Sequence, residues 1–147
     1  MKIAIGSDHT ALDMKALIIE HLTDKGHELT DLGTYTEQSC DYPVYGEKVA
    51  RAVQRGECER GVLICGTGLG MSYAANKVRG IRAACVSEPV SARLATEHNS
   101  AQIICFGARI VGDEMARAIV DAFFGAEYQG GRHQRRVDQI GEIEGRA

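Results

Sequence analysis

The sequence predicts an α/β fold in which a five-stranded parallel sheet carries helices on both faces. Two observations support this: short apolar runs alternate with stretches of helical periodicity, and no linker, repeat or low-complexity tract interrupts them. With right-handed crossovers, the result is a single-domain, Rossmann-like three-layer sandwich over residues 1–147, with an extra C-terminal helix.

The apolar runs are the predicted strands. They are rich in aliphatic and β-branched residues, which is typical of strands buried on both faces of a parallel sheet. In chain order they lie at residues 2–6, 27–32, 61–65, 81–86 and 102–107.

Helices are predicted where apolar residues recur three or four positions apart. The three clearest faces are Ala11, Met14, Ile18 and Leu22; Tyr45, Val49, Ala52 and Val53; and Met115, Ile119, Ala122 and Phe123. Two shorter helices are expected at 68–78 and 89–98, and glycines at 26 and 56 should end the first two helices. Beyond Tyr128, a Gly-Gly turn precedes an Arg-rich helix.

Composition excludes several classes of protein. Hydrophobic residues make up 44% and charged residues 25%, as in ordinary globular proteins. A formal charge of −3 gives no general attraction to nucleic acid or to anionic membranes. No apolar run approaches the roughly 18 residues of a membrane span, and the start MKIAIGSDH does not resemble a signal peptide. We expect a cytoplasmic protein.

The five cysteines are 40, 58, 65, 85 and 105. Their odd number and the lack of a C-x-x-C pair argue against a disulfide scaffold or a structural zinc site. Cys85 and Cys105 lie in apolar runs and are expected to be small buried side chains, while Cys40 and Cys58 lie in polar loops. Only Cys65 has an unusual setting.

Cys65 stands at the start of a glycine loop between a predicted strand and a predicted helix, in GVLICGTGLG at 61–70. Backbone amides at a helix N-terminus favour negative charge, so the loop could hold an anion or favour a thiolate. A dinucleotide fingerprint would need a glycine at Met71 and normally follows the first strand. A nucleotide cradle, a redox-sensitive thiol, a core thiol and a catalytic base stay open from this stretch alone.

Other chemically active side chains follow the predicted strands, at the edge where open parallel sheets bind ligands. They are Asp8 and His9 after the first strand, Tyr42 at the end of the long loop after the second, and Arg109 after the fifth. Together with Cys65 they suit a small, polyhydroxylated, anionic substrate.

Two further groups are less easily placed. His98 and Asn99 precede the last strand and so lie at the opposite edge from Cys65, about 17 Å away along a five-residue strand. They either end a helix or serve the site of a neighbouring subunit. Arg132 and Arg136, four positions apart, could grip a phosphate from one face of a helix or form part of a solvated charged tail.

Several blocks, in order, resemble the ribose-5-phosphate isomerase B family, whose relatives include galactose-6-phosphate and allose-6-phosphate isomerases. The resemblance runs from Lys2 to about Ile143. Its blocks are SDH at 7–9, DYP at 41–43, ICGTGLG at 64–70, AANK at 74–77, GIRA at 80–83, EHN at 97–99, FGAR at 106–109 and GGRH at 130–133.

The resemblance implies an aldose–ketose isomerase that acts on D-ribose 5-phosphate and D-ribulose 5-phosphate, in the pentose phosphate pathway, through a cis-enediolate. It implies that no metal or organic cofactor is needed. It also implies homodimers with shared active sites, sometimes paired into tetramers. The implied roles are as follows: Cys65 as the base; Thr67 and the amides of Gly66, Gly68 and Gly70 holding the enediolate; His98 opening the ring, with Asn99 beside it; Asp8 and Tyr42 on sugar hydroxyls; and His9, Arg109, Arg132 and Arg136 as candidates for the phosphate.

One departure concerns the substrate. Many members carry two glycines after SDH, whereas this chain has Thr10 and Ala11. Bulkier side chains at that pocket edge keep a hexose 6-phosphate open as an alternative substrate. A nucleotide-binding module remains the alternative outside the isomerases.

Overall fold

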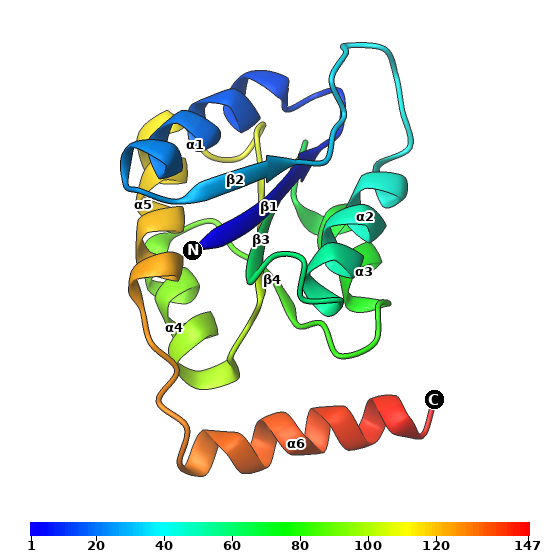
Figure 1. The fold of residues 1–147 in the computed structure, drawn as a ribbon, viewed down its shortest axis with the longest axis vertical. Helices are drawn as coiled ribbons and strands as arrows, with labels where there is room; N and C mark the ends of the chain where they lie inside the picture. Colours follow the sequence, from blue (N-terminus) through cyan, green and yellow to red (C-terminus); the bar gives the residue numbers. More distant parts are fainter.

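The computed structural model describes residues 1–147 and contains a five-stranded parallel sheet with the strand order β2-β1-β3-β5-β4 (Figure 1). The strands are β1 (Lys2–Ser7), β2 (Glu28–Asp31), β3 (Arg60–Cys65), β4 (Ala83–Cys85) and β5 (Ile103–Gly107). Ser7 pairs with Ile64, and Cys65 pairs with Gly107. The carboxyl ends of β1, β3 and β5 therefore meet at one edge of the sheet.

Helices cover both faces of this sheet, which confirms the predicted three-layer sandwich (Figure 1). One face carries α1 (Leu12–Asp24), α4 (Pro89–Asn99) and α5 (Asp113–Gly125), and the other carries α2 (Tyr42–Gln54) and α3 (Leu69–Asn76). The chain leaves β1 towards β2 and leaves β3 in the opposite direction towards β4. A topological switch point, where open α/β sheets bind ligands, therefore lies between β1 and β3.

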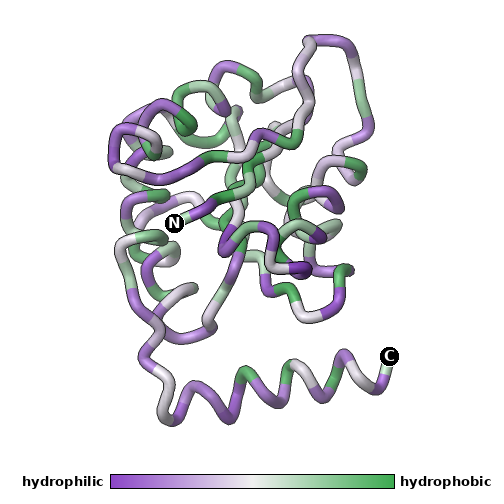
Figure 2. Tube along the Cα trace, viewed as in Figure 1, coloured by the Kyte–Doolittle hydropathy of each residue, from purple (hydrophilic) through white to green (hydrophobic).

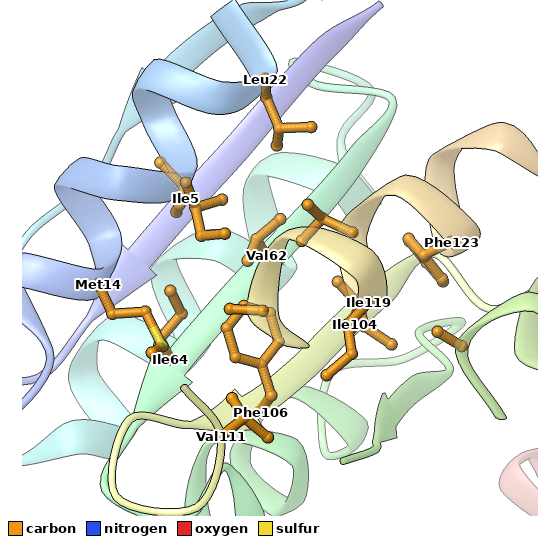
Figure 3. Packing of buried hydrophobic residues seen from close by; sticks show 14 of the residues in the cluster. Ile5, Met14, Leu22, Val62, Ile64, Ile104, Phe106, Val111, Ile119 and Phe123 are labelled. Carbon is orange, nitrogen blue, oxygen red and sulfur yellow. The ribbon is translucent and has the colours of Figure 1, made fainter. Parts of the chain in front are cut away.

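Each face has its own hydrophobic core. Eighteen buried residues form the core beneath α1, α4 and α5, and 14 form the core beneath α2 and α3. The ring of Phe106 lies among side chains of β3, β5 and α5 in the first core, and it is fully buried (Figure 3). Burying such a ring contributes about 1.5–3 kcal/mol to folding. In Figure 2 the strands in the middle of the sheet are coloured mostly as hydrophobic.

The predicted helix ends are confirmed. Gly26 and Gly56 each lie two residues beyond the last residue of a helix and have φ of +91° and +76°. Glycine adopts this left-handed conformation without the penalty that a Cβ brings, so it stops α1 and α2. The Arg-rich helix is also present as α6 (Arg132–Gly145), which extends from the body of the molecule (Figure 1). No helix combines the length and apolarity needed to cross a membrane.

Three details of the sequence interpretation are wrong. Met115 is 40% exposed, because Ala116 and Val120 complete the buried stripe of α5 with Ile119 and Phe123. Cys58 is buried in the core beneath α2 and α3, since its amide donates to the Ala52 carbonyl and folds the loop back on α2. Cys85 is only half-buried because β4 is a short edge strand.

Candidate active site

The carboxyl edge of the sheet gathers most of the predicted site residues. Asp8 and His9 follow β1, the glycine loop follows β3, and Arg109 follows β5. Asp8 donates its amide to the Ile64 carbonyl at 3.2 Å, which ties the turn after β1 to the end of β3. The prediction that these residues share one edge is confirmed.

Cys65 is the last residue of β3, and its side chain is only 5% exposed. The Gly68 amide donates a hydrogen bond to the Cys65 Sγ at 3.1 Å. Thr67 is exposed, and its hydroxyl oxygen accepts from the Leu69 amide at 3.2 Å rather than contacting the thiol. The thiol is therefore held by the main chain of the loop.

The loop owes its shape to close backbone approaches. Gly68 has φ of +82° and caps the N-terminus of α3. A Cβ on Gly68 would stand 2.7 Å from the Phe106 carbonyl carbon, and one on Gly107 would stand 2.5 Å from the Thr67 Cα. Neither position has room for a side chain, so the loop lies directly on the last residues of β5.

Backbone donors remain free in this loop. The amides of Gly66, Thr67, Gly70 and Met71 donate no hydrogen bond within the chain. They lie at the N-terminus of α3, where the helix dipole adds to their attraction for negative charge. This arrangement can stabilise an oxyanion next to the Cys65 thiol.

Asp8 and His9 are both held by neighbouring backbone. One oxygen of Asp8, Oδ1, accepts from the Thr10 amide at 2.9 Å and from the Thr10 hydroxyl at 2.6 Å. The His9 Nδ1 accepts from the Cys40 amide at 3.3 Å, so a neutral His9 ring carries its proton on Nε2. His9 thus keeps an Nε2 donor for a ligand.

Tyr42 and Arg109 flank the glycine loop. Tyr42 begins α2, and its ring lies so close to Gly70 that a Cβ there would stand 2.5 Å from two ring carbons. The Arg109 amide donates to the Gly66 carbonyl at 3.0 Å, and its side chain lies over Gly66. A phenol and a guanidinium therefore border the free amides.

A second cluster forms at the opposite edge of the sheet. His98 and Asn99 end α4, whose carbonyls at Asn99 and Ser100 accept from the Arg82 guanidinium at 2.9 Å each. The Gln129 amide donates to the Glu97 carbonyl at 3.0 Å, which brings the start of α6 to the end of α4. Within one chain, His98 and Asn99 are therefore remote from Cys65.

Arg132 and Arg136 join this second cluster from the first turns of α6. Between them in the chain, His133 stacks on His98 with ring centroids 4.3 Å apart. Burial, and then the positive charges of His98 and the two arginines, lower the pKa of His133 below its usual range. Neither arginine takes part in an ion pair, and nor does Arg109. All three remain free to bind an anion.

Several contributors escaped the sequence interpretation. Thr10, Cys40 and Gly107 shape the carboxyl-edge cluster, and His133 packs against His98. Gly107 and His133 belong to the FGAR and GGRH blocks, so the resemblance to the isomerase family could have pointed to these two residues. Thr10 was marked only as a departure at the pocket edge and not as a partner of Asp8, and nothing in the local pattern marked Cys40. The structure holds no group of three or more His, Cys, Asp or Glu side chains arranged to bind a metal ion.

The chain is similar to known sugar-phosphate isomerases. The family model described as Ribose/Galactose Isomerase matches residues 3–140. Ribose-5-phosphate isomerase B of Escherichia coli is 52% identical over 145 residues, which cover 99% of this chain and 97% of that protein. The galactose-6-phosphate isomerase subunit LacB of Clostridium acetobutylicum is 42% identical, with 93% of this chain and 79% of that protein covered. The D-erythrulose-4-phosphate isomerase of Pectobacterium atrosepticum is also 42% identical, with 98% of this chain and 95% of that protein covered.

Solved structures agree over the whole chain. Ribose-5-phosphate isomerase B of Clostridium thermocellum has a TM-score of 0.98 at 53% identity and covers 99% of both chains. The enzyme of Mycoplasma genitalium, solved with bound ribulose-5-phosphate, has a TM-score of 0.94 at 43% identity, with 99% of this chain and 97% of that chain covered. This chain is therefore an enzyme of the ribose/galactose isomerase family, to which the ribose-5-phosphate isomerases of type B belong.

Proposed function

We propose that this enzyme interconverts D-ribose 5-phosphate and D-ribulose 5-phosphate through a cis-enediolate, with Cys65 as the base. The observation that carries the proposal is a thiol next to free backbone amides at the carboxyl edge of the sheet. The names of the Escherichia coli relative and of the ribulose-5-phosphate complex support this substrate.

In the proposed reaction, the Cys65 thiolate removes the proton from C2 of the open-chain aldose. The electron pair left on C2 forms the C1–C2 double bond, and the carbonyl oxygen on C1 takes up the negative charge. The free amides of Gly66, Thr67 and Gly70 stabilise that oxyanion, as an oxyanion hole does in acyl transfer. The Gly68 amide, to which the resemblance assigns the same role, donates to the Cys65 Sγ instead. A proton passes from O2 to O1, and the thiol returns its proton to C1, which yields the ketose.

The remaining roles divide between the two clusters. Asp8 and Tyr42 bind sugar hydroxyls, and the His9 Nε2 donor and the Arg109 guanidinium bind the phosphate from the carboxyl edge. His98, with Asn99 beside it, opens the furanose ring, and Arg132 and Arg136 add phosphate contacts from the second cluster. Because these clusters lie at opposite edges of the sheet within one chain, we propose a homodimer with shared active sites, with pairing into a tetramer as a further step.

An isomerase assay tests the function. Wild type should convert ribose 5-phosphate to ribulose 5-phosphate equally well with and without EDTA, because the proposed mechanism uses no metal. Cys65→Ala should lose roughly 10²-fold or more in kcat, the low end of what a positioned proton-transfer group contributes. Cys58→Ala is a matched control, since Cys58 is also buried but lies before the first residue of β3. A Cys65→Ala variant as active as the control rules out the thiol as base.

The substrate is tested against its neighbours in size. Relatives named for galactose 6-phosphate and for D-erythrulose 4-phosphate make hexose and tetrose phosphates the alternatives within this family. Comparing kcat/KM on allose 6-phosphate, galactose 6-phosphate, erythrulose 4-phosphate and ribose 5-phosphate decides among them. ATP or NAD(H) binding without turnover would indicate a nucleotide module, and a peroxide-dependent sulfenate without turnover would indicate a redox sensor.

Four broader expectations also remain proposals. We place the enzyme in the cytoplasm and in the pentose phosphate pathway. Residues 1–147 act as one sugar-phosphate isomerase domain, and no cofactor takes part.

A further inference from the structure

Thr10 and Ala11, which follow the SDH block, have different surroundings. Ala11 is 1% exposed and packs in the core beneath α1, so its methyl group does not reach the ligand edge. Thr10 is half-buried, and its hydroxyl contacts Asp8. Neither residue has a positive φ, so neither position requires glycine. Of these two residues, only Thr10 contacts a residue of the carboxyl-edge cluster, namely Asp8.

The two oxygens of Asp8 are not equivalent. Oδ1 accepts both the Thr10 amide at 2.9 Å and the Thr10 hydroxyl at 2.6 Å. Hydrogen bonds to a carboxylate are shorter and stronger than those between neutral groups. Oδ2 accepts no hydrogen bond within the chain. It is not fully buried, because the only fully buried side-chain N or O atom without a hydrogen-bond partner is the Ser7 Oγ. Oδ2 is therefore open to an outside donor.

The main chain fixes the other end of the same side chain. The Asp8 amide donates to the Ile64 carbonyl, which directly precedes Cys65. Asp8 as a whole is only 7% exposed. Its carboxylate is thus held at the backbone and at Oδ1, with Oδ2 free one strand away from the thiol.

We propose that Thr10 is a positioning residue of the sugar site, which holds the Asp8 carboxylate so that Oδ2 accepts a hydrogen bond from a sugar hydroxyl. The inference rests on the proposed function, because it takes Asp8 as a ligand of the sugar. Thr10 itself does not touch the substrate. Without its hydroxyl, the Asp8 carboxylate keeps one amide donor and rotates more freely about χ2, a torsion with broad minima.

The expected effect falls on binding rather than on turnover. Ordering one mobile side chain costs binding free energy that corresponds to roughly a twofold to tenfold rise in KM. The hydroxyl that Asp8 contacts does not react, so its contact is equally strong in the ground state and the transition state, and kcat should change less than about twofold. A merely structural defect would lower kcat or the unfolding temperature instead.

Three variants separate these cases. Thr10→Val keeps the volume and the amide but removes the hydroxyl, and it should raise KM for ribose 5-phosphate. Thr10→Ser restores the hydroxyl and should bring KM back to within about twofold of wild type, since a serine donates the same bond. Thr23→Val is the matched control, because Thr23 is exposed on α1 and its side chain makes no hydrogen bond.

A double variant tests whether the effect passes through Asp8. In an Asp8→Ala background, Thr10→Val should cause no further rise in KM, because the two residues are no longer coupled once Asp8 has lost its carboxylate. Calorimetric affinity for ribose 5-phosphate replaces KM wherever turnover is too slow. If Thr10→Val unfolds, Thr10→Ala, which removes the hydroxyl without adding volume, carries the same comparison.

The outcomes distinguish the two levels of the inference. An active wild type with an unchanged KM in Thr10→Val overturns the positioning role alone. The same holds if Thr10→Ser is as defective as Thr10→Val, or if the full KM rise persists without Asp8. A wild type that neither binds nor isomerises ribose 5-phosphate overturns the proposed function, and the role of Thr10 with it.

Discussion

Cys65 and His98 belong to opposite edges of the sheet in one chain. Cys65 is the last residue of β3, whereas His98 lies in the last turn of α4, just before β5 begins. A strand of five residues spans about 17 Å, which is too far for one pentose phosphate to touch both side chains. In Figure 1, β1, which is parallel to β3, runs away from the side of the molecule where α6 lies. A shared site therefore needs two chains.

This geometry predicts that two inactive variants complement each other. In a dimer of Cys65→Ala with His98→Ala, one site combines both defects and the other combines an intact Cys65 with an intact His98. Each heterodimer should thus have about half the wild-type activity, and random mixing should yield about a quarter, since half of the dimers are mixed.

The assay uses two affinity tags. Each variant is co-expressed with the other, heterodimers are isolated by sequential capture, and isomerisation of ribose 5-phosphate is followed. The control pairs two differently tagged copies of Cys65→Ala, so every site lacks the thiol and no activity should return. Purified heterodimers of the first pair that stay as inactive as their parents would refute the shared site, as would equal recovery in the control.

The remaining predictions concern stability. Lys15→Met removes the buried ammonium that binds the Asp31 carboxylate of β2 at 2.9 Å and the Thr34 carbonyl. Because the Asp31 side chain is 33% exposed and keeps the Gly33 amide as a donor, the free energy of unfolding in urea should fall by about 1–3 kcal/mol, against little change in Lys25→Met. Gly68→Ala should lower the free energy of unfolding by roughly 1–3 kcal/mol or more, since φ at Gly68 is +82° and β5 leaves no space for a Cβ. Gly141→Ala, which places a methyl group in open space on α6, should instead raise the free energy of unfolding by up to about 1 kcal/mol. Because the pKa of His133 is lowered on folding, the unfolded chain binds more protons as the pH falls below about 6.5. Stability should therefore decline with falling pH in that window, less steeply in His133→Gln, as measured by urea unfolding at each pH.

The sequence predicted the layers well because a parallel sheet buried on both faces leaves a plain pattern. Apolar runs marked the strands, and positive-φ glycines at 26 and 56 marked the ends of α1 and α2. The strand order was not predictable, since β5 lies between β3 and β4 through pairings that no local pattern encodes. The same holds for Met115: its exposure depends on how α5 is rotated against its neighbours.

The candidate site was predictable for a geometric reason. Parallel strands end together, so residues after β1, β3 and β5 had to share an edge, and His98 had to lie at the other one. Contacts that depend on a loop folding back were not accessible. Cys58 reads as a polar-loop residue and is buried, and the hold of Thr10 on Asp8 depends on side-chain direction within a turn.

The glycine loop also explains why one thiol among several suits proton transfer. Cys65, Cys85 and Cys105 all face the core beneath α2 and α3. Burial, and then the charge of neighbouring thiols, raises the pKa of Cys85 and raises that of Cys105 further. Cys85 donates towards the Thr67 carbonyl at 3.8 Å, whereas Cys65 alone accepts a backbone N–H, from Gly68. Cys65 is therefore the thiol whose sulfur accepts a backbone hydrogen bond and lies beside the free amides, which fits the role proposed for it as the base.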